Sequence, residues 1–242
     1  MDRKGKYIIH IFIVLCTYGI IYFLCKLDVK GYVEPCNDIE ELLCSVSGFT
    51  VTEFPLDVKG TMIKWMLALS VVYILVGREI YSQLNDLKYI AMIRYGSYRN
   101  FYRSLMNKTS ITSLLYGICG VGITYVLYLC SGNGQVSNRD FLEMSVIYVL
   151  QLLLLCLIQT VCFISFSGYT VSVIVLILWV MVAMCGHFVV GENWNWLPTN
   201  WGMYIRSAKR IDGGVTNAAY GIQSIACVLL WIGTPFIIKR KR

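Results

Sequence analysis

The chain has 242 residues, of which 57% are hydrophobic and only 14% are charged. Soluble domains carry about 25% charged residues, so this composition excludes an ordinary soluble enzyme, and the high apolar content equally excludes intrinsic disorder. The formal net charge of +7 would suit a nucleic-acid-binding protein if the basic residues formed one patch. They follow the loops between apolar segments instead, so we expect no nucleic-acid partner.

Six apolar stretches predict an all-α, polytopic membrane protein. An α-helix of about 20 residues crosses the roughly 30 Å hydrocarbon core of a bilayer. The second stretch is the weakest, because Lys64 lies in its first turn and Arg78 follows its end, and both side chains are expected to extend toward the lipid headgroups. The predicted spans are 7–25, 61–77, 110–130, 141–166, 169–190 and 218–238, which form a single transmembrane domain over residues 1–242.

The basic residues are distributed unevenly between the loops. Thirteen of them lie in the N-terminal segment, in residues 78–109 and in the C-terminal tail, whereas the 26–60 loop holds seven acids against three lysines. Basic residues concentrate on the cytoplasmic side of membrane proteins. We therefore expect a multi-pass protein of the cell membrane with both termini and the 78–109 segment in the cytoplasm. The 26–60 and 191–217 loops are expected outside, although the second holds three basic residues.

The cytoplasmic segment 78–109 has the pattern of two amphipathic helices separated by Gly96–Ser97. After this break, aromatic and aliphatic residues fall on one helix face, and Arg99 and Arg103 fall on the other. Helices that combine aromatic and arginine side chains are typical of the membrane surface. Two interpretations follow: the segment is an interfacial anchor, or it projects from the membrane to dock on a cytoplasmic partner.

The two larger external loops differ in composition. Cys36 and Cys44 face an oxidising compartment in this topology, so they either form a disulfide or remain reduced thiols that help to pack the loop. The neighbouring acids Asp38, Glu40 and Glu41 would attract a cationic peptide. The 191–217 loop is rich in tryptophan, which favours the membrane interface. We therefore expect this second loop to lie on the outer leaflet.

Polar groups are sparse inside the predicted spans. Ionisable residues there are costly and usually functional, but the two histidines of the chain lie near span ends without a paired acid. No P-loop motif occurs, so we expect no catalytic residue, no metal and no cofactor. Gln151 and Gln159 share one span and either hydrogen-bond to neighbouring helices or line a polar translocation path. Three glycines of the 110–130 span, Gly117, Gly120 and Gly122, predict close helix approach.

The layout of the whole chain resembles the membrane subunit of small six-helix ABC exporters, the type-2 export permeases. The shared features are two cytoplasmic termini, an amphipathic cytoplasmic segment between helices 2 and 3, and a very short turn between helices 4 and 5. The run Arg94-Tyr95-Gly96-Ser97-Tyr98-Arg99 is similar to the R-x-G-S-x-R turn of such permeases from Gram-positive bacteria. The resemblance implies that residues 80–107 include the coupling helix on which the ATPase docks. The docking residues it implies are Arg94, Tyr95, Tyr98, Arg99, Phe101, Tyr102 and Arg103.

The resemblance implies a non-catalytic permease that forms the translocation path for a peptide or other amphipathic substrate. Its partners would be a separate ATP-binding cassette subunit, which hydrolyses the ATP, a second permease subunit of the same or a sister sequence, and membrane lipid. Small permeases of this kind often export bacteriocins or other peptide antibiotics, or give immunity to them. The alternative is a non-transporting immunity, receptor or assembly protein that binds a cationic peptide through the acidic 26–60 loop.

Overall fold

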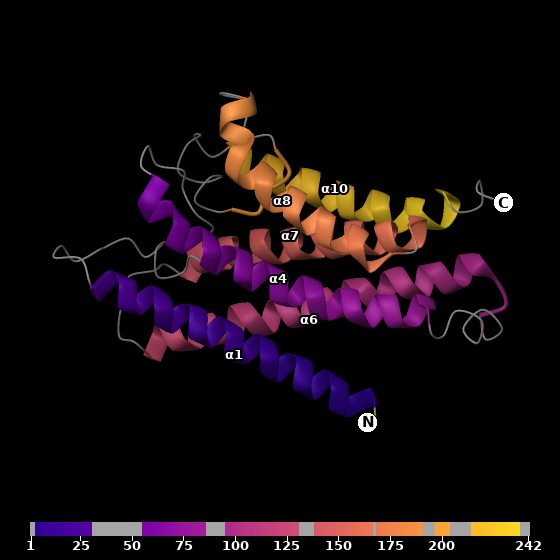
Figure 1. Cartoon of the computed structure of the whole chain (residues 1–242), viewed down its shortest axis with the longest axis horizontal. Helices are drawn as coiled ribbons and strands as arrows, with labels where there is room; N and C mark the ends of the chain where they lie inside the picture. The colour runs from indigo at the N-terminus through magenta and orange to yellow at the C-terminus, as the bar shows by residue number, and fades with distance from the viewer. Residues whose placement is uncertain are drawn as a thin grey trace.

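The computed structural model describes residues 3–30, 55–85, 95–130, 138–166, 168–190, 197–203 and 214–237. Every regular element in these ranges is an α-helix, which confirms the predicted class for this part of the chain. The helices are α1 (Arg3–Lys30), α4 (Pro55–Asn85), α6 (Tyr98–Cys130), α7 (Asn138–Ser165), α8 (Tyr169–Val190) and α10 (Gly214–Ile237). Figure 1 shows them as one elongated bundle.

Each helix contains most of one predicted span, but α4 and α6 continue well beyond theirs. Residues 78–85 are the last turns of α4 and residues 98–109 are the first turns of α6, and residues 86–94 between them lie outside the described residues. The predicted break at Gly96–Ser97 is confirmed. Gly96 adopts the left-handed conformation with φ of 66°, and Ser97 caps α6 by accepting a hydrogen bond at Oγ from the Asn100 amide at 3.2 Å.

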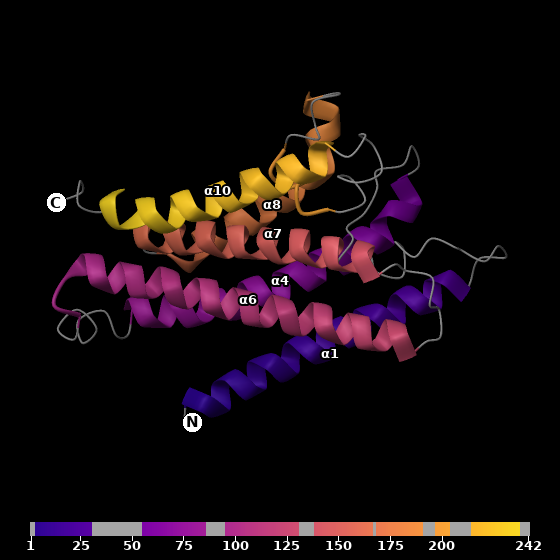
Figure 2. The same ribbon diagram turned by 180° about the vertical axis from the view of Figure 1, so that it is seen from behind.

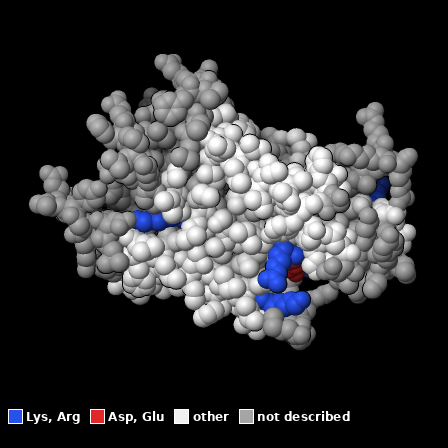
Figure 3. Space-filling view, viewed as in Figure 1, with Lys and Arg blue, Asp and Glu red and all other residues white. Residues whose placement is uncertain are grey.

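The surface of the bundle is that of a membrane protein. Three described helical stretches are long and apolar enough to cross a bilayer, Gly5–Cys25, Tyr98–Cys130 and Phe141–Ser165, and two shorter apolar ones are Tyr169–Ala183 and Tyr220–Thr234. Large apolar side chains point outward along the helices, among them Ile8, Phe12, Ile111, Ile118, Leu142 and Leu229. On the described part of the face in Figure 3, charged side chains form only a few small patches.

Two basic residues of α4, Lys64 and Arg78, were expected to extend toward the lipid headgroups. Arg78 is exposed, as expected for a side chain that reaches the headgroups. Lys64 is 9% exposed, so the bundle encloses its side chain. The prediction that this side chain extends toward the headgroups is therefore wrong.

Helix α7 lies at the centre of the bundle. It packs against α4, α6, α8 and α10, and α1 packs on the side formed by α4 and α6. Figures 1 and 2 show that α1 begins and α10 ends at the end of the bundle where α4 finishes and α6 starts. The opposite end carries the start of α7.

Tyr18 of α1 joins four helices in the buried core. Its hydroxyl donates to the Ala68 carbonyl of α4 at 3.2 Å. Because this bond uses the only proton of the Tyr18 hydroxyl, the Tyr148 hydroxyl of α7 donates to Tyr18 in the bond between them. The Tyr18 ring covers Gly120 of α6, where a Cβ atom would lie 2.6 Å from Tyr18 Cζ. The predicted close approach is thus confirmed at Gly120.

The other two glycines of α6 do not share this role. A Cβ atom at Gly117 would make ordinary contacts of 3.4 Å with Val149 and Leu152, and one at Gly122 would meet nothing within 4 Å. The close approach predicted for Gly122 is therefore wrong among the described residues.

Gly120→Ala is expected to lower the free energy of unfolding by about 2 kcal/mol, because the added methyl group forces Tyr18 away from Ala68 and Tyr148. Gly122→Ala is the matched control in the same helix, and should be neutral or slightly stabilising through helix propensity. Thermal unfolding of both purified variants in detergent micelles measures the difference. Equal stability of the two variants would contradict the role given to Gly120.

Candidate functional site

The start of α6 carries the residues implied for ATPase docking, and the structure divides them into two groups. Tyr95 is 39% exposed, Arg99 and Arg103 are exposed, and Tyr98 is half-buried. Phe101 and Tyr102 are only 2% and 7% exposed, so they pack inside this chain and offer almost no surface to a partner. Arg94 lies outside the described residues. The surface open to docking is therefore formed by Tyr95, Tyr98, Arg99 and Arg103, named here the α6 docking face.

Aromatic packing holds the docking face against the bundle. The Phe101 ring lies 6.0 Å from the Tyr95 ring and 5.3 Å from the Tyr102 ring, and Tyr98 stacks on Tyr102 at 6.3 Å. The Ser104 hydroxyl donates to the Tyr95 hydroxyl at 2.9 Å. The aromatic face that the sequence assigned to the membrane surface thus packs within the protein, and the first turns of α6 continue straight into the apolar span.

A second contact fastens α10 to the same part of α6. The Arg103 guanidinium carbon lies 5.5 Å from the centre of the Trp231 ring, a cation–π geometry. The Trp231 indole N–H donates to Asn107 Oδ1 at 2.7 Å. Movement at the start of α6 is therefore coupled to the last turns of α10.

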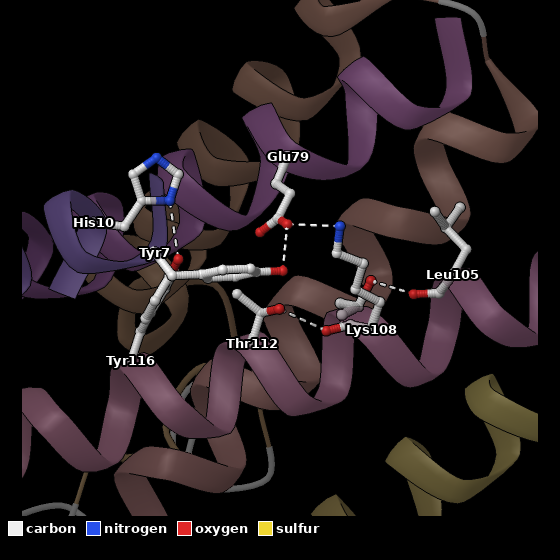
Figure 4. Close-up of polar contacts among 8 residues, drawn as sticks. Tyr7, His10, Glu79, Leu105, Lys108, Thr112 and Tyr116 are labelled. Atoms are coloured by element: carbon white, nitrogen blue, oxygen red, sulfur yellow. Dashed lines mark hydrogen bonds and ion pairs between the residues drawn. The ribbon is translucent and has the colours of Figure 1, made fainter. Parts of the chain in front are cut away.

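Close to this face, a charged cluster joins α1, α4 and α6 (Figure 4). Glu79 Oε1 accepts a hydrogen bond from the Tyr7 hydroxyl at 2.7 Å and pairs with Lys108 Nζ at 2.6 Å. The side chains of Lys108 and Glu79 are 24% and 16% exposed. His10 Nδ1 lies 2.9 Å from the Tyr116 hydroxyl, one turn further along α1 and two turns along α6. We call these five residues the Glu79 cluster.

Partial burial makes the ion pair of the Glu79 cluster stronger than an exposed one, because the surrounding protein screens charge less than water does. Each helix contributes a different partner, so the pair fixes the ends of α1 and α4 on α6. Lys108 follows Arg99 by nine residues, or about 14 Å along the helix. The cluster therefore restrains α6 immediately behind its docking face.

The Glu79 cluster could not be recognised in the sequence. Glu79 and Lys108 stand 29 residues apart and both read as ordinary charges of a cytoplasmic segment. The only signal was that Tyr7 and His10 are polar residues in an apolar stretch, and neither indicates its partner.

The two glutamines of α7 bind different parts of the chain. Gln159 Nε2 donates to Ser172 Oγ of α8 at 2.7 Å, and the Tyr73 hydroxyl of α4 donates to the Ser172 carbonyl at 2.7 Å. This geometry is the helix-to-helix bonding that was one of the two interpretations for Gln159. Gln151 Nε2 instead donates to the Thr199 carbonyl at 2.9 Å. A translocation path along both glutamines remains a prediction.

The contact of Gln151 identifies an unexpected part of the 191–217 loop. Residues 197–203 form a turn inside the bundle, with Thr199 and Asn200 each 2% exposed and Met203 fully buried. These three side chains are therefore covered by protein, and the position of the loop on the outer leaflet stays a prediction. Tryptophan content does not distinguish a loop on the surface from one inserted into the protein, because indole rings suit both places.

The remaining predicted sites lie outside the described residues. They are the cysteines Cys36 and Cys44 and the acids Asp38, Glu40 and Glu41, so the disulfide and the attraction of a cationic peptide stay predictions. Within the described ranges, no three His, Cys, Asp or Glu side chains are grouped closely enough to hold a metal ion.

Comparison with known proteins adds no relative: no protein-family model, no curated protein and no solved structure matches the chain. Its function therefore has to be inferred from the geometry described above.

A double-mutant cycle on Glu79→Gln and Lys108→Gln is expected to give a coupling energy of about 2 kcal/mol, because each single change leaves a partly buried charge without its partner. The control is the same cycle on Arg139 and Glu143, whose ion pair at 3.2 Å is 85% and 33% exposed and should couple by less than about 0.5 kcal/mol. Denaturant unfolding in micelles measures both cycles. A Glu79–Lys108 coupling as small as that of the control pair would remove the proposed restraint.

Proposed function

We propose that the chain is the non-catalytic permease subunit of an ABC exporter, driven by a separate ATPase subunit. In this proposal all six helices cross the cell membrane, with both termini and the turn before α6 in the cytoplasm. Support comes from the bundle, in which α1 begins and α10 ends toward the same end as the start of α6 (Figure 1). It also comes from the thirteen basic residues that the sequence concentrates in these three places.

The observation that carries the proposal is the continuity of α6. This helix runs for 33 residues from the capped turn at Ser97 to Cys130, about 50 Å. Its exposed start has the composition of a docking site, because tyrosine and arginine are the residues that most often anchor protein interfaces. Its middle meets Tyr18 at Gly120. A push on the docking face would therefore reach the centre of the bundle along a single rigid element.

The contacts behind the docking face support this role. Phe101 and Tyr102 belong to a buried core shared with α1 and α4, the Glu79 cluster joins the same three helices, and Arg103 contacts Trp231 of α10. The ATPase would thus move four helices together. A peptide or other amphipathic molecule is the substrate class that fits a bundle with few charges inside, and a second permease subunit completes the exporter.

Docking predicts that the double variant Tyr95→Ala, Arg99→Glu binds its ATPase at least tenfold more weakly. Both side chains are exposed, so their replacement removes an aromatic anchor and reverses a charge at the surface. The measurement is co-purification and titration of the chain with its candidate ATPase subunit.

Arg139→Glu is the control, because Arg139 is equally exposed but lies at the other end of the bundle. Its ATPase affinity should equal that of the unmodified chain. Undiminished affinity of the double variant would overturn docking at this face. If the chain bound no ATPase but did bind a cationic peptide with steep salt dependence, the protein would instead be a non-transporting peptide-binding partner.

A further inference from the structure

The 197–203 turn reaches the middle of the bundle. Gln151, which binds it, is the fourteenth residue of the 28-residue helix α7, about 20 Å from the start of a helix about 42 Å long. Non-helical backbone at such a depth in a membrane protein is tolerated where protein surrounds it or where it lines a polar cavity. Interrupted segments near the midplane commonly line the binding sites of transporters.

Gln151 contacts the turn through main-chain atoms, which any bound peptide would also offer. The carbonyl of Thr199 accepts the hydrogen bond from Gln151 Nε2. The backbone of Gly202 lies directly against the same amide, so that a Cβ atom at Gly202 would overlap Gln151 Oε1. The Gln151 side chain therefore contacts the main chain of the turn at both Thr199 and Gly202.

A second glutamine lies at the same depth on α10. Helices α7 and α10 run side by side in the same direction: the Tyr220 hydroxyl donates to the Glu143 carbonyl at 3.0 Å, and Cys227 belongs to one buried cluster with Leu154 and Leu157. Gln223 lies about midway between Tyr220 and Cys227, which places it within about one helical turn of the level of Gln151. Its side chain is fully buried.

Several polar atoms at this level have no hydrogen-bond partner among the described residues. They are Nε2 and Oε1 of Gln223, Oε1 of Gln151 and Oγ1 of Thr199; the described residues hold further such atoms, among them one each on Glu79, Gln159 and Trp179. Buried polar atoms in native proteins are nearly always bonded, so four at one depth require an explanation. All four belong to uncharged groups that both donate and accept. Their complement is a neutral group that also does both, and the peptide amide is the group of this kind that a peptide substrate supplies.

We propose that Gln151, Thr199 and Gln223 form a binding site for the main-chain amides of a peptide, and that the 197–203 turn is a plug occupying part of this site. Gln151 binds the plug through one main-chain carbonyl, and a substrate peptide would take its place. This inference rests on the proposed function, because it names the substrate class of the same translocation path. It needs no ATPase to be tested.

The first test compares Gln223, which has no hydrogen-bond partner among the described residues, with Gln159, whose Nε2 is bonded although its Oε1 is not. Gln223→Leu should raise the melting temperature of the full chain in lipid nanodiscs, because it removes two unpaired polar atoms from the interior. Gln159→Leu should lower it, because Gln159 is bonded to Ser172. A lower melting temperature for Gln223→Leu would show that Gln223 is a structural residue and would overturn the proposal.

The second test measures peptide binding by calorimetric titration of the same nanodiscs. The probe is an acetyl-Leu-Ala-Leu-Ala-amide peptide, compared with an analogue methylated at every peptide nitrogen. Gln223→Leu should weaken binding of the probe at least tenfold, and Gly202→Ala should strengthen it about tenfold by expelling the plug. Gly221→Ala is the matched control, since a Cβ atom there meets nothing within 4 Å.

The outcomes are distinct from those of ATPase docking. Equal binding of the methylated analogue would show that main-chain amides are not recognised. No binding by either the unmodified chain or Gly202→Ala would also overturn the site, while leaving the docking face unaffected.

Discussion

The contact between Tyr18 and Gly120 is the constraint on which the bundle depends. A tyrosine hydroxyl inside a membrane protein must find its partners within the protein, because lipid supplies none. Tyr18 finds them on α4 and α7, at Ala68 and Tyr148, and its ring reaches them only by crossing α6 where that helix has no side chain. One residue thereby sets the separation of four helices.

The other polar contacts are arranged by depth around this crossing. Charged groups lie where α4 ends and α6 starts, as in the Glu79–Lys108 pair. The neutral amides of Gln151 and Gln223 lie further in and are buried, whereas the Thr109 and Thr160 hydroxyls, which bond at 2.9 Å between α6 and α7, lie at the level of Lys108. This order follows the cost of desolvation, which is greatest for full charges and smaller for amides and hydroxyls. This arrangement is compatible with the proposed exporter, in which an ATPase docks near the Glu79–Lys108 pair and a neutral peptide main chain binds at the buried glutamines.

Structural features that depend on residues close together in the sequence were predictable. The six helices follow from the length of each apolar run, and the break before α6 follows from Gly96 and Ser97, whose backbone conformation and capping are local properties. The full length of α6 was not predictable, because an amphipathic turn that continues a span has the same pattern as one that lies beside the membrane. Only tertiary packing, here of Phe101 and Tyr102 inside the chain, distinguishes the two.

Contacts between residues far apart in the sequence could not be predicted. Nothing near Glu79 indicates Lys108, and nothing near Gln151 indicates that Thr199 folds back to it. The polarity of Gln151 showed that a partner was needed, but a neighbouring helix and a transported molecule satisfy that need equally well. The structure supplies a third partner, the inserted turn, which no periodicity in residues 191–217 describes.

The central claim is that the start of α6 faces the cytoplasm, where an ATPase can reach it, and the topology of the chain tests this most directly. Short peptide tags complementing a cytoplasmic reporter would be placed at the two ends of the chain, within 26–60 and within 131–137. The account predicts reporter signal from both ends only, and labelling from outside intact cells for the two internal tags. A cytoplasmic signal from the 131–137 tag would contradict it, because α4 would then not cross the membrane and the start of α6 would lie outside.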